Sequence, residues 1–480
     1  MTLTFVALFA IFALLYASLL PAKWRQWALH IGSIVFLFAL QPELAIRNLG
    51  FIVSLLTLVL VIIVWMVTRN RTVPISRDDK LTFIVTLITT GLLAGTRYLP
   101  PEYRFIEARP PEFIAVLLLL LIPLLIAGLI WKLPIKLPSL LSKKWLVIYL
   151  LVIVLVILKT EVLAEAMAGF LRSLTGQQVE LASVGDLGWL GISYIAFRLI
   201  HLIRDRQQGL LPALGLREHI TYVIFFPSLA SGPIDRAERF SKDWQALPTL
   251  PLWVSSRLIE GGGRIVVGLV KKFVIADTLA IIALNDANAL QTTQAGSLWV
   301  MLYAFAFRLF FDFSGYSDIV IGIGIWLGVR LPENFNQPYL KNSITAFWQS
   351  WHITLSTWVR SYVFSPLSRK MVVKRVPQTR AVLIAQLTTM ITIGLWHGVT
   401  LPFIVWGAWH GLGLFFHKLW SDRTRKRYLH LKKQPQKLRL WTWFGIFITF
   451  HFVVIGWVWF ALSNFETAFI TFGRLFGVGF

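Results

Sequence analysis

Long apolar runs separated by short charged loops dominate this sequence and restrict what the chain can fold into. A helix needs about 20 apolar residues to cross the hydrocarbon core of a bilayer. Runs that approach this length lie at residues 3–20, 27–40, 51–67, 81–95, 113–131, 145–158, 187–203, 265–284, 300–311, 319–329, 381–396, 403–416 and 441–462. Because a helix satisfies its backbone hydrogen bonds within one segment, the pattern predicts an all-α integral membrane protein.

The amount and placement of charge agree with a location in lipid. Only 14% of the residues are charged, whereas soluble chains carry about 25%. The net charge of +23 comes from short loops, as expected for cytoplasmic loops of membrane proteins, and no basic stripe on a soluble face predicts nucleic-acid binding. The chain contains no Cys, which excludes disulfides, thiolate metal sites and a cysteine nucleophile.

Loop charges predict the orientation of the helices. The first run has no basic residue before it and is followed by Lys23 and Arg25, so we expect a retained first span with its N-terminus outside the cell membrane. The most basic loop, residues 418–439, has nine Lys or Arg against Asp422 and is predicted to be cytoplasmic.

Residues 219–231 are too short for an ordinary span and are followed closely by Gly232 and Pro233. Irregular backbone at membrane depth is tolerated only where protein or a cavity surrounds it, so we expect a re-entrant segment here. Together with the apolar runs, this predicts a multi-span helical bundle of about 11 to 13 spans, with re-entrant segments around a polar channel.

Polar side chains interleave with aromatic ones over residues 311–367. Polar groups inside a membrane are costly and often mark a functional site, so the segment predicts a helix pair that lines a polar cavity. Asp312, Asp318 and Asn334 are candidate cavity residues, and hydrogen bonding between helices is the alternative for each.

Two histidines are the candidate catalytic groups. On a helix, His352 and Ser356 would share a face, and the alternative for His352 is a solvated side chain in an interfacial aromatic belt. His397 ends an apolar run, where a neutral imidazole is suited to act as a general base for a hydroxyl; the alternative is a hydrogen bond between packed helices. No metal site is predicted for His397 with His410, because the His-Glu-x-x-His pattern and nearby carboxylates are absent.

Four sequences in the same order and spacing resemble the bacterial branch of the membrane-bound O-acyltransferase family. They are FDFSGYSD at 311–318, PENFNQPY at 332–339, FWQSWHITLSTW at 347–358 and WHG at 396–398. Weaker similarities extend the resemblance over about residues 186–469, while the first spans match in hydropathy alone. We therefore divide the chain into N-terminal transmembrane helices, residues 1–185, and a core similar to this family, residues 186–480.

The resemblance implies a helical bundle pierced by a channel, acyl transfer to a hydroxyl, and roles for particular residues. His397 corresponds to the principal histidine of the family, and His352 to the second histidine of its bacterial branch. The expected channel or substrate-binding residues are Asp312, Asp318, Asn334, Trp351, Ser356 and Trp396. No bound cofactor is expected; the acyl donor, acetyl-CoA or an acyl carrier protein thioester, is a substrate from the cytoplasmic side, and the acceptor is a glycan or an extracytoplasmic partner acyltransferase.

Two bacterial branches remain open at this point: acetylation of polysaccharides, as in the alginate O-acetyltransferases, and D-alanyl transfer toward teichoic acid. Gln349, Ser350 and Ser361 depart from the pattern of the acetylating branch. A transporter or flippase of an acyl donor would also contain broken helices and polar residues at membrane depth, and a scaffold for a partner acyltransferase is a further alternative. Acetyl transfer to an extracytoplasmic polysaccharide or cell-envelope glycan is the leading hypothesis.

Overall fold

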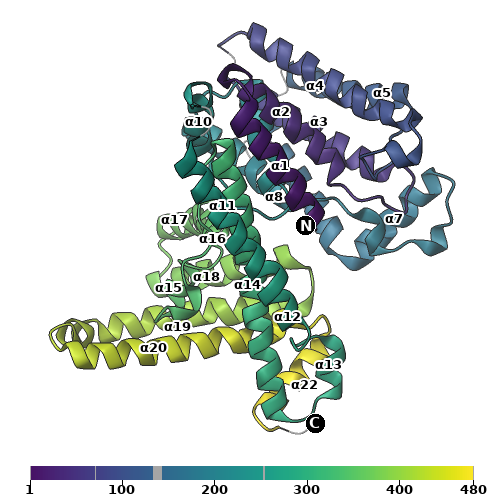
Figure 1. Cartoon of the computed structure of the whole chain (residues 1–480). Helices are drawn as coiled ribbons and strands as arrows, with labels where there is room; N and C mark the ends of the chain where they lie inside the picture. Colours follow the sequence, from purple (N-terminus) through teal and green to yellow (C-terminus); the bar gives the residue numbers. More distant parts are fainter. Residues whose placement is uncertain (1, 71, 133–142, 252–253, 479–480) are drawn as a thin grey trace. The chain divides into compact units, whose positions relative to one another are not determined.

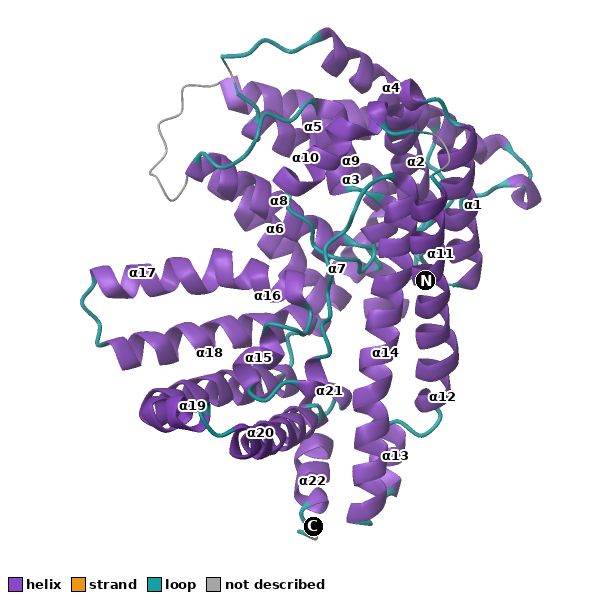
Figure 2. Cartoon of the chain, turned by 60° about the vertical axis from the view of Figure 1, so that its left-hand side comes forward, coloured by secondary structure: helices purple, strands orange, loops and turns teal. Residues whose placement is uncertain are grey.

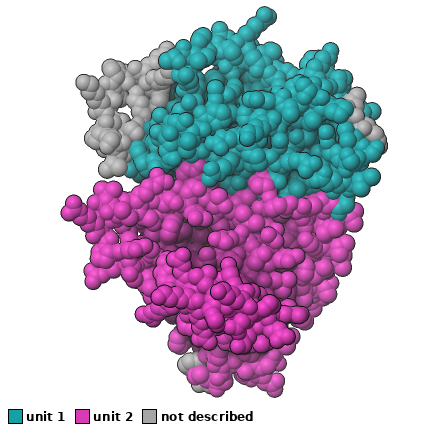
Figure 3. All heavy atoms as spheres, turned by 90° about the vertical axis from the view of Figure 1, so that its left-hand side faces the viewer, with its two compact units in different colours: residues 1–263, 320–331 teal, residues 264–319, 332–480 magenta. Residues whose placement is uncertain are grey.

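The computed structural model describes residues 2–70, 72–132, 143–251 and 254–478, and every regular element in this part of the chain is a helix (Figures 1 and 2). The all-α prediction is therefore confirmed. The chain forms two compact units (Figure 3), one of residues 1–263 and 320–331 and the other of residues 264–319 and 332–480. The division at residue 185 that similarity suggested stays a prediction.

The first unit contains the helices of the N-terminal half. They are α1 Leu3–Leu19, α2 Arg25–Ala39, α3 Leu49–Thr68, α4 Arg77–Gly95, α5 Phe113–Lys132, α6 Lys143–Lys159, α7 Glu161–Leu174, α8 Ile192–Gln208, α9 Leu216–Val223, α10 Ala237–Ala246 and α11 Ser255–Leu269, of which α11 continues into the second unit. Short 3-10 turns lie at Ala22–Trp24, Thr96–Tyr98, Pro101–Tyr103, Val179–Leu181, Val184–Leu187, Phe226–Ser228 and Leu247–Thr249.

Two of the most apolar helices in this unit differ in how much of their surface is buried inside the protein. The apolar window of α3 is 72% buried inside the protein, whereas that of α5 is 17% buried. A helix that is apolar on all sides lies either inside a large core or in lipid, so α3 forms a centre of the unit and α5 has the surface of a lipid-facing span. Leu49 and Val53 of α3 pack with Ala164 and Ala168 of α7.

The segment predicted to be re-entrant is a short helix followed by a turn. Helix α9 has only eight residues, and the turn Phe226–Ser228 after it is fully buried. Arg198 of α8 donates hydrogen bonds to the Val223 carbonyl at 2.8 Å and to the Ser228 carbonyl at 3.0 Å. The broken backbone that the sequence predicted is therefore confirmed, and an arginine satisfies its carbonyl groups.

The second unit contains the C-terminal helices and the four sequence motifs on which the resemblance rests. Its helices are α12 Asp277–Ala280, α13 Asp286–Gln291, α14 Ala295–Leu327, α15 Ile344–Trp348, α16 Ile353–Val359, α17 Ser365–Val373, α18 Gln378–His397, α19 Leu401–Leu431, α20 Pro435–Gly456, α21 Val458–Ala461 and α22 Phe465–Leu475, with the last residues of α14 in the first unit. A 3-10 turn lies at Pro338–Leu340, and π-helical segments at Val270–Ala276 and Arg360–Phe364 join α11 to α12 and α16 to α17.

Fewer helices are long and apolar enough to cross a membrane than the sequence predicted. The described residues contain six, and the bent pair α6–α7 would make a seventh, against the predicted total of about 11 to 13. Other predicted spans form shorter helices, such as α1, α2 and α8 with 15 to 17 residues each.

Two predicted boundaries were wrong. Residues 300–311 and 319–329 were predicted as separate runs, but α14 continues through the polar sequence between them for 33 residues. The basic residues 418–439 were predicted as a loop, but α19 extends to Leu431 and α20 begins at Pro435. Charge ends an apolar run without ending a helix. Lys and Arg are good helix formers, which suits α19, and the Asp312 and Asp318 carboxylates of α14 pair with lysines.

Candidate active site

Helices α18 and α19 form a close hairpin in which glycine spacing places His397. The sequences Gly394-x-x-x-Gly398 and Gly407-x-x-x-Gly411 have the small-residue spacing that lets membrane helices approach closely. A Cβ atom on Gly407 would lie 2.7 Å from the Ile391 Cα atom and from the Met390 carbonyl oxygen of α18. Only glycine fits there. Gly411, which ends the second Trp-His-Gly sequence, also faces α18, since its Cβ atom would lie 3.1 Å from the Leu387 Cα atom.

His397 is the last residue of α18 and is half-buried among aromatic rings. Its ring centroid lies 4.5 Å from that of Trp396, 4.7 Å from that of Phe460 and 5.8 Å from that of Trp406. The free carbonyl groups at a helix C-terminus favour a positive charge. An imidazolium formed at this position would therefore be stabilised by the end of α18.

His352 does not lie within a helix, so the prediction that it shares a helical face with Ser356 was wrong. It precedes α16 with a left-handed backbone at φ 42° and ψ 55°. The Ser356 hydroxyl instead donates to the Trp351 carbonyl at 3.1 Å. A non-glycine residue in this region costs on the order of 1–3 kcal/mol and needs surrounding structure to hold it.

The side chain of His352 is buried, which excludes the alternative of a solvated histidine in an aromatic belt. It is 3% exposed, and its ring packs edge-on against Phe313 at a centroid distance of 4.6 Å. Its Nε2 atom has no hydrogen-bond partner among the described residues. Buried polar atoms are nearly always paired, so this nitrogen is free to bind a substrate atom or water.

The structure brings both histidines to the same aromatic side chain. The Trp396 ring centroid lies 6.3 Å from that of His352 and 4.5 Å from that of His397. Trp351 is buried in the aromatic core, with centroids 5.2 Å from both Phe335 and Trp457. Of the predicted aromatic site residues, Trp396 therefore contacts both histidines, whereas Trp351 packs within the aromatic core.

Asn334 uses its hydrogen-bonding groups to hold the start of α16. It is fully buried, and its Oδ1 atom accepts a hydrogen bond from the Thr354 hydroxyl at 2.6 Å. Its Nδ2 group donates to the Ser317 hydroxyl at 3.3 Å, and its backbone carbonyl accepts from the Ile353 N–H at 2.9 Å. These bonds surround the left-handed turn at His352, so Asn334 supports the position of that imidazole.

Asp312 and Asp318 pair with cations from α11 and from the π-helical turn that follows it. Asp318 accepts from Lys271 at 2.6 Å and from Arg264 at 2.7 Å, and Asp312 pairs with Lys272. A π-helical turn inside a helix often marks a functional site; here it presents two consecutive lysines to α14. The interhelical pairing considered as the alternative for these carboxylates is what the structure shows.

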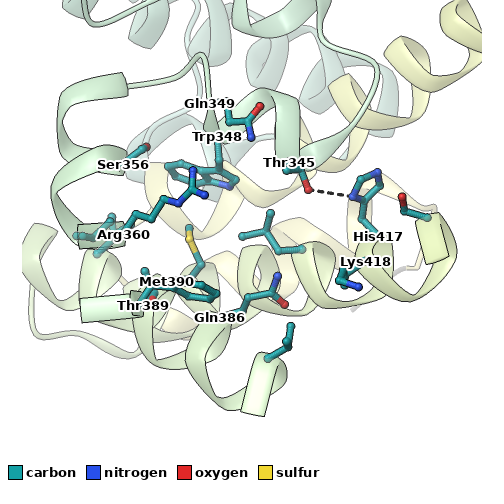
Figure 4. A pocket seen from close by; sticks show the side chains of 16 residues that line it. Thr345, Trp348, Gln349, Ser356, Arg360, Gln386, Thr389, Met390, His417 and Lys418 are labelled. Atoms are coloured by element: carbon teal, nitrogen blue, oxygen red, sulfur yellow. Dashed lines mark hydrogen bonds between the residues drawn. The ribbon is translucent and has the colours of Figure 1, made fainter. Parts of the chain in front are cut away.

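A cavity of about 500 Å³ lies among α15, α16, α18 and α19, and neither His352 nor His397 is among the residues that line it (Figure 4). Its lining includes Ser356, four residues after His352, and Ile393, four residues before His397. The size lies within the range of about 300–1,000 Å³ that is typical of small-molecule sites. Of the eight predicted site residues, Ser356 is the one that lines this cavity.

Polar groups of the cavity come from α15, α16, α18 and α19. They are Thr345, Gln349, Ser356, Arg360, Gln386, Thr389, His417, Lys418 and Ser421. Arg360 extends toward Trp348, and the Thr345 hydroxyl is hydrogen bonded to His417 Nδ1 at 2.9 Å (Figure 4). The Trp348 Nε1 and Gln386 Oε1 atoms, on two residues that line the cavity, are buried without a hydrogen-bond partner among the described residues.

Sequence reasoning missed Gln386 and Lys418 as cavity residues. A signal for Gln386 was present, because it is a lone amide within the apolar run of α18 and intramembrane polar residues mark functional sites.

No group of three or more His, Cys, Asp or Glu that could hold a metal ion occurs in the described ranges. His410 is fully buried between Trp406 and Trp348, at centroid distances of 4.9 and 5.3 Å.

A sequence model of the membrane-bound O-acyltransferase family matches residues 102–459, well over half of the chain. The protein belongs to the membrane-bound O-acyltransferase family. With six long apolar helices in the part of the chain that the structure describes, this membrane-bound O-acyltransferase is a multi-pass membrane protein.

Relatives of this family member are named for three different polymers, alginate, teichoic acid and peptidoglycan. The chain is 38% identical over 295 residues to a probable alginate O-acetylase of Pseudomonas syringae, covering 60% of this chain and 52% of the relative. It is 33% identical to a teichoic acid D-alanyltransferase of Streptococcus thermophilus, covering 57% and 68%, and 35% identical to a peptidoglycan O-acetyltransferase of Helicobacter pylori, covering 52% and 45%. The chain spans about half the length of the alginate O-acetylases that it matches.

Proposed function

We propose that this protein transfers a small acyl group, with acetyl as the leading candidate, to hydroxyls of an extracytoplasmic polysaccharide or cell-envelope glycan. The observation that carries the proposal is the pairing of His352 and His397 around Trp396, with the buried His352 Nε2 atom left without a hydrogen-bond partner among the described residues. Family membership and the similarity to polysaccharide acetylases support the same class of reaction.

In the proposed reaction His397 is the general base. A ring nitrogen of the neutral imidazole accepts the proton of the acceptor hydroxyl as its oxygen attacks the carbonyl carbon of the thioester donor. The carbon–sulfur bond then breaks, and the departing thiolate takes the proton back from the imidazolium. The products are an ester and a free thiol, and the end of α18 stabilises the positive charge in between.

His352 is the proposed second catalytic group. Its buried, unpaired Nε2 atom can hydrogen bond to the donor or the acceptor oxygen and so orient the reacting atoms. Asn334 is a positioning residue that acts through its hydrogen bonds to Ile353 and Thr354, the two residues after His352.

The cavity beside Ser356 is the proposed site of the acyl donor. Arg360 and Lys418 give it a cationic side, which suits the phosphates of coenzyme A or of a carrier protein's prosthetic arm. We place the basic end of α19 in the cytoplasm of a cell whose plasma or inner membrane the protein spans, with its N-terminus outside. The donor then approaches from the cytoplasm, and a glycan or a partner acyltransferase receives the acyl group outside.

A second candidate is D-alanyl transfer to a polymer similar to teichoic acid. The chain covers 68% of the Streptococcus thermophilus D-alanyltransferase, a larger share than of the alginate O-acetylases. A cavity of about 500 Å³ has room for either acyl group.

The test compares envelope glycans from a deletion strain that carries the wild-type protein, His397→Ala or His430→Ala. His430 is an exposed histidine at the end of α19 and serves as a matched control. General base catalysis contributes about 10²–10⁴ in rate, so His397→Ala should abolish the ester that mass spectrometry detects, while His430→Ala should restore it. The mass of the ester distinguishes acetyl from D-alanyl, and equal restoration by both variants would refute the proposed role of His397.

A further inference from the structure

A second cavity of about 780 Å³ forms a groove between α19 and α20, which lie side by side (Figures 1 and 2). The two helices are tied together by the Trp409 indole, which donates to the Phe452 carbonyl at 3.0 Å. The nature of the lining changes along the groove. Ser421, Thr424 and Arg425 line one end, and apolar side chains, including Leu412 and Ile448, line the other.

The polar end has the composition of a membrane–water interface. Trp420 and Trp441 stack with a centroid distance of 6.5 Å, and Arg427 lies over the Trp441 ring at 5.7 Å. Tryptophan and tyrosine side chains gather where headgroups meet the hydrocarbon core. Arg425 has no ion-pair partner in the part of the chain that the structure describes, so its charge is available to an anion.

The apolar end is open to the surroundings. Phe416 and Phe444 are each 61% exposed, and Ile448 is 50% exposed. Helix α20 is one of the helices long and apolar enough to span a membrane. Lipid tails therefore contact this side of the groove.

The length of the groove fits one leaflet. Leu412 and Arg425 are 13 positions apart on α19, which corresponds to about 20 Å along a helix. Half of the hydrocarbon core of a bilayer is about 15 Å thick. A groove of this length has room for an acyl chain whose phosphate lies at Arg425.

We propose that this groove binds one anionic phospholipid, with its phosphate against Arg425, Thr424 and Ser421 and one acyl chain along Leu412 and Ile448. Positive charge at one end selects an anionic headgroup, and the apolar length requires a tail. A soluble phosphate would leave the apolar end unused, and a protein partner would have to enter the bilayer to reach it.

The groove shares lining residues with the cavity of about 500 Å³ described above. Asn342, Ser343 and Ile344, at the start of α15, form another side of the groove. His417 lines both cavities and is held by Thr345 of α15. A bound lipid would therefore support α15 and His417, although the binding proposal itself does not depend on the proposed function.

The test is a titration of the full-length detergent-purified protein, followed by native mass spectrometry. The probes are phosphatidylglycerol, phosphatidylcholine with the same chains, and glycerol phosphate without chains. We expect one phosphatidylglycerol to bind more tightly than phosphatidylcholine, and no binding of glycerol phosphate at the same concentrations. Equal affinity for phosphatidylglycerol and phosphatidylcholine would overturn the headgroup assignment, and equal binding of glycerol phosphate would overturn the role of the tail.

Two variants with the same charge change locate the site. Arg425→Gln should weaken phosphatidylglycerol binding about fivefold, the effect of one basic residue near an anionic lipid. Lys426→Gln is the control, because Lys426 is the next residue on α19, is exposed and does not line the groove. Equal weakening by the two variants would mean diffuse attraction to the basic end of α19 and would overturn the proposal.

The tail is tested by Ile448→Trp, which narrows the apolar end and should weaken both phospholipids together. Ile448 is half exposed, so the larger side chain can be accommodated without disturbing the core. Unchanged affinity for phosphatidylglycerol in this variant would overturn the assignment of the acyl chain.

Discussion

Replacing Asn334 by alanine should impair catalysis through the position of His352. The substitution removes the acceptor of the Thr354 hydroxyl and the donor to Ser317, both of which are buried. Each buried polar group left without a partner costs about 1–3 kcal/mol. The left-handed backbone at His352 costs a similar amount, so the turn can relax to an ordinary conformation once this support is lost.

The size of the effect follows from these energies. If relaxation of the turn gains about 1.4–2.7 kcal/mol, the conformation with His352 in place falls about 10- to 100-fold in population, because each 1.36 kcal/mol is a factor of ten. We expect the rate of thiol release from the acyl donor to fall by about this factor, with little change in KM. The cavity beside Ser356 and Arg360 keeps its lining in this variant, since Asn334 is not one of the residues that line it.

The matched control is Asn336→Ala. Asn336 lies two residues further along the same segment, is exposed, and contributes only its backbone N–H, which donates to the Ser350 carbonyl at 3.0 Å. The control should have wild-type kinetics and thermal stability. Asn334→Ala with wild-type kcat would refute the argument that Asn334 positions His352, and a loss shared by both variants would show that the segment tolerates no alanine.

Three further predictions concern stability. Gly407→Ala should lower the melting temperature by overpacking α18 against α19, at a cost of about 1–3 kcal/mol in the free energy of unfolding. Gly263→Ala should be neutral or stabilising, because Gly263 has open space around it. Equal melting temperatures of the two variants would contradict the close packing at Gly407. Asp318→Asn should lower the free energy of unfolding by about 1–3 kcal/mol, less than the loss of a fully buried pair, because Lys271 and Arg264 are about 30% exposed. Asp422→Asn, in an exposed pair, should lower it by less than about 1 kcal/mol. Chemical denaturation compares the two variants. The hydrogen bond from Arg172 holds the pKa of Asp186 below its ordinary value of 3.8, so the stability that this pair adds is present at neutral pH and is lost as the pH falls through that lowered pKa. The difference in melting temperature between the wild type and Asp186→Asn should therefore disappear only in strong acid. A difference that disappears at pH 5 to 6 would refute this.

Apolar patterning predicted several helices well. Helix α5 begins at Phe113, as its apolar run does, and α18 ends one residue beyond the predicted run, at His397. These segments are predictable because their length and hydrophobicity meet the requirement of a bilayer without help from distant residues. The pattern failed at α14, where the carboxylates of Asp312 and Asp318 suggested a break that the structure does not have.

The candidate site was predictable in its residue types and less so in its geometry. His352 and His397 were identified from local sequence and similarity, and the structure places both beside Trp396. Asn334 was predicted to line a channel, but its amide is bonded to Ser317 and Thr354. A sequence shows that a buried amide needs partners, but it does not show whether those partners are protein groups or a substrate.

The amino-acid sequence by itself determined the helical class, the membrane setting and the family, because hydrophobic length and ordered motifs are properties of single segments. Only the tertiary structure decided the left-handed turn at His352, the pairing of Asp318 with Lys271 across 47 positions of sequence, and the cavity that Gln386 and Lys418 help to line. Each of these depends on which segments meet in space. Polar groups in a low-dielectric interior must find partners wherever the fold supplies them, and that choice is made by packing between distant helices.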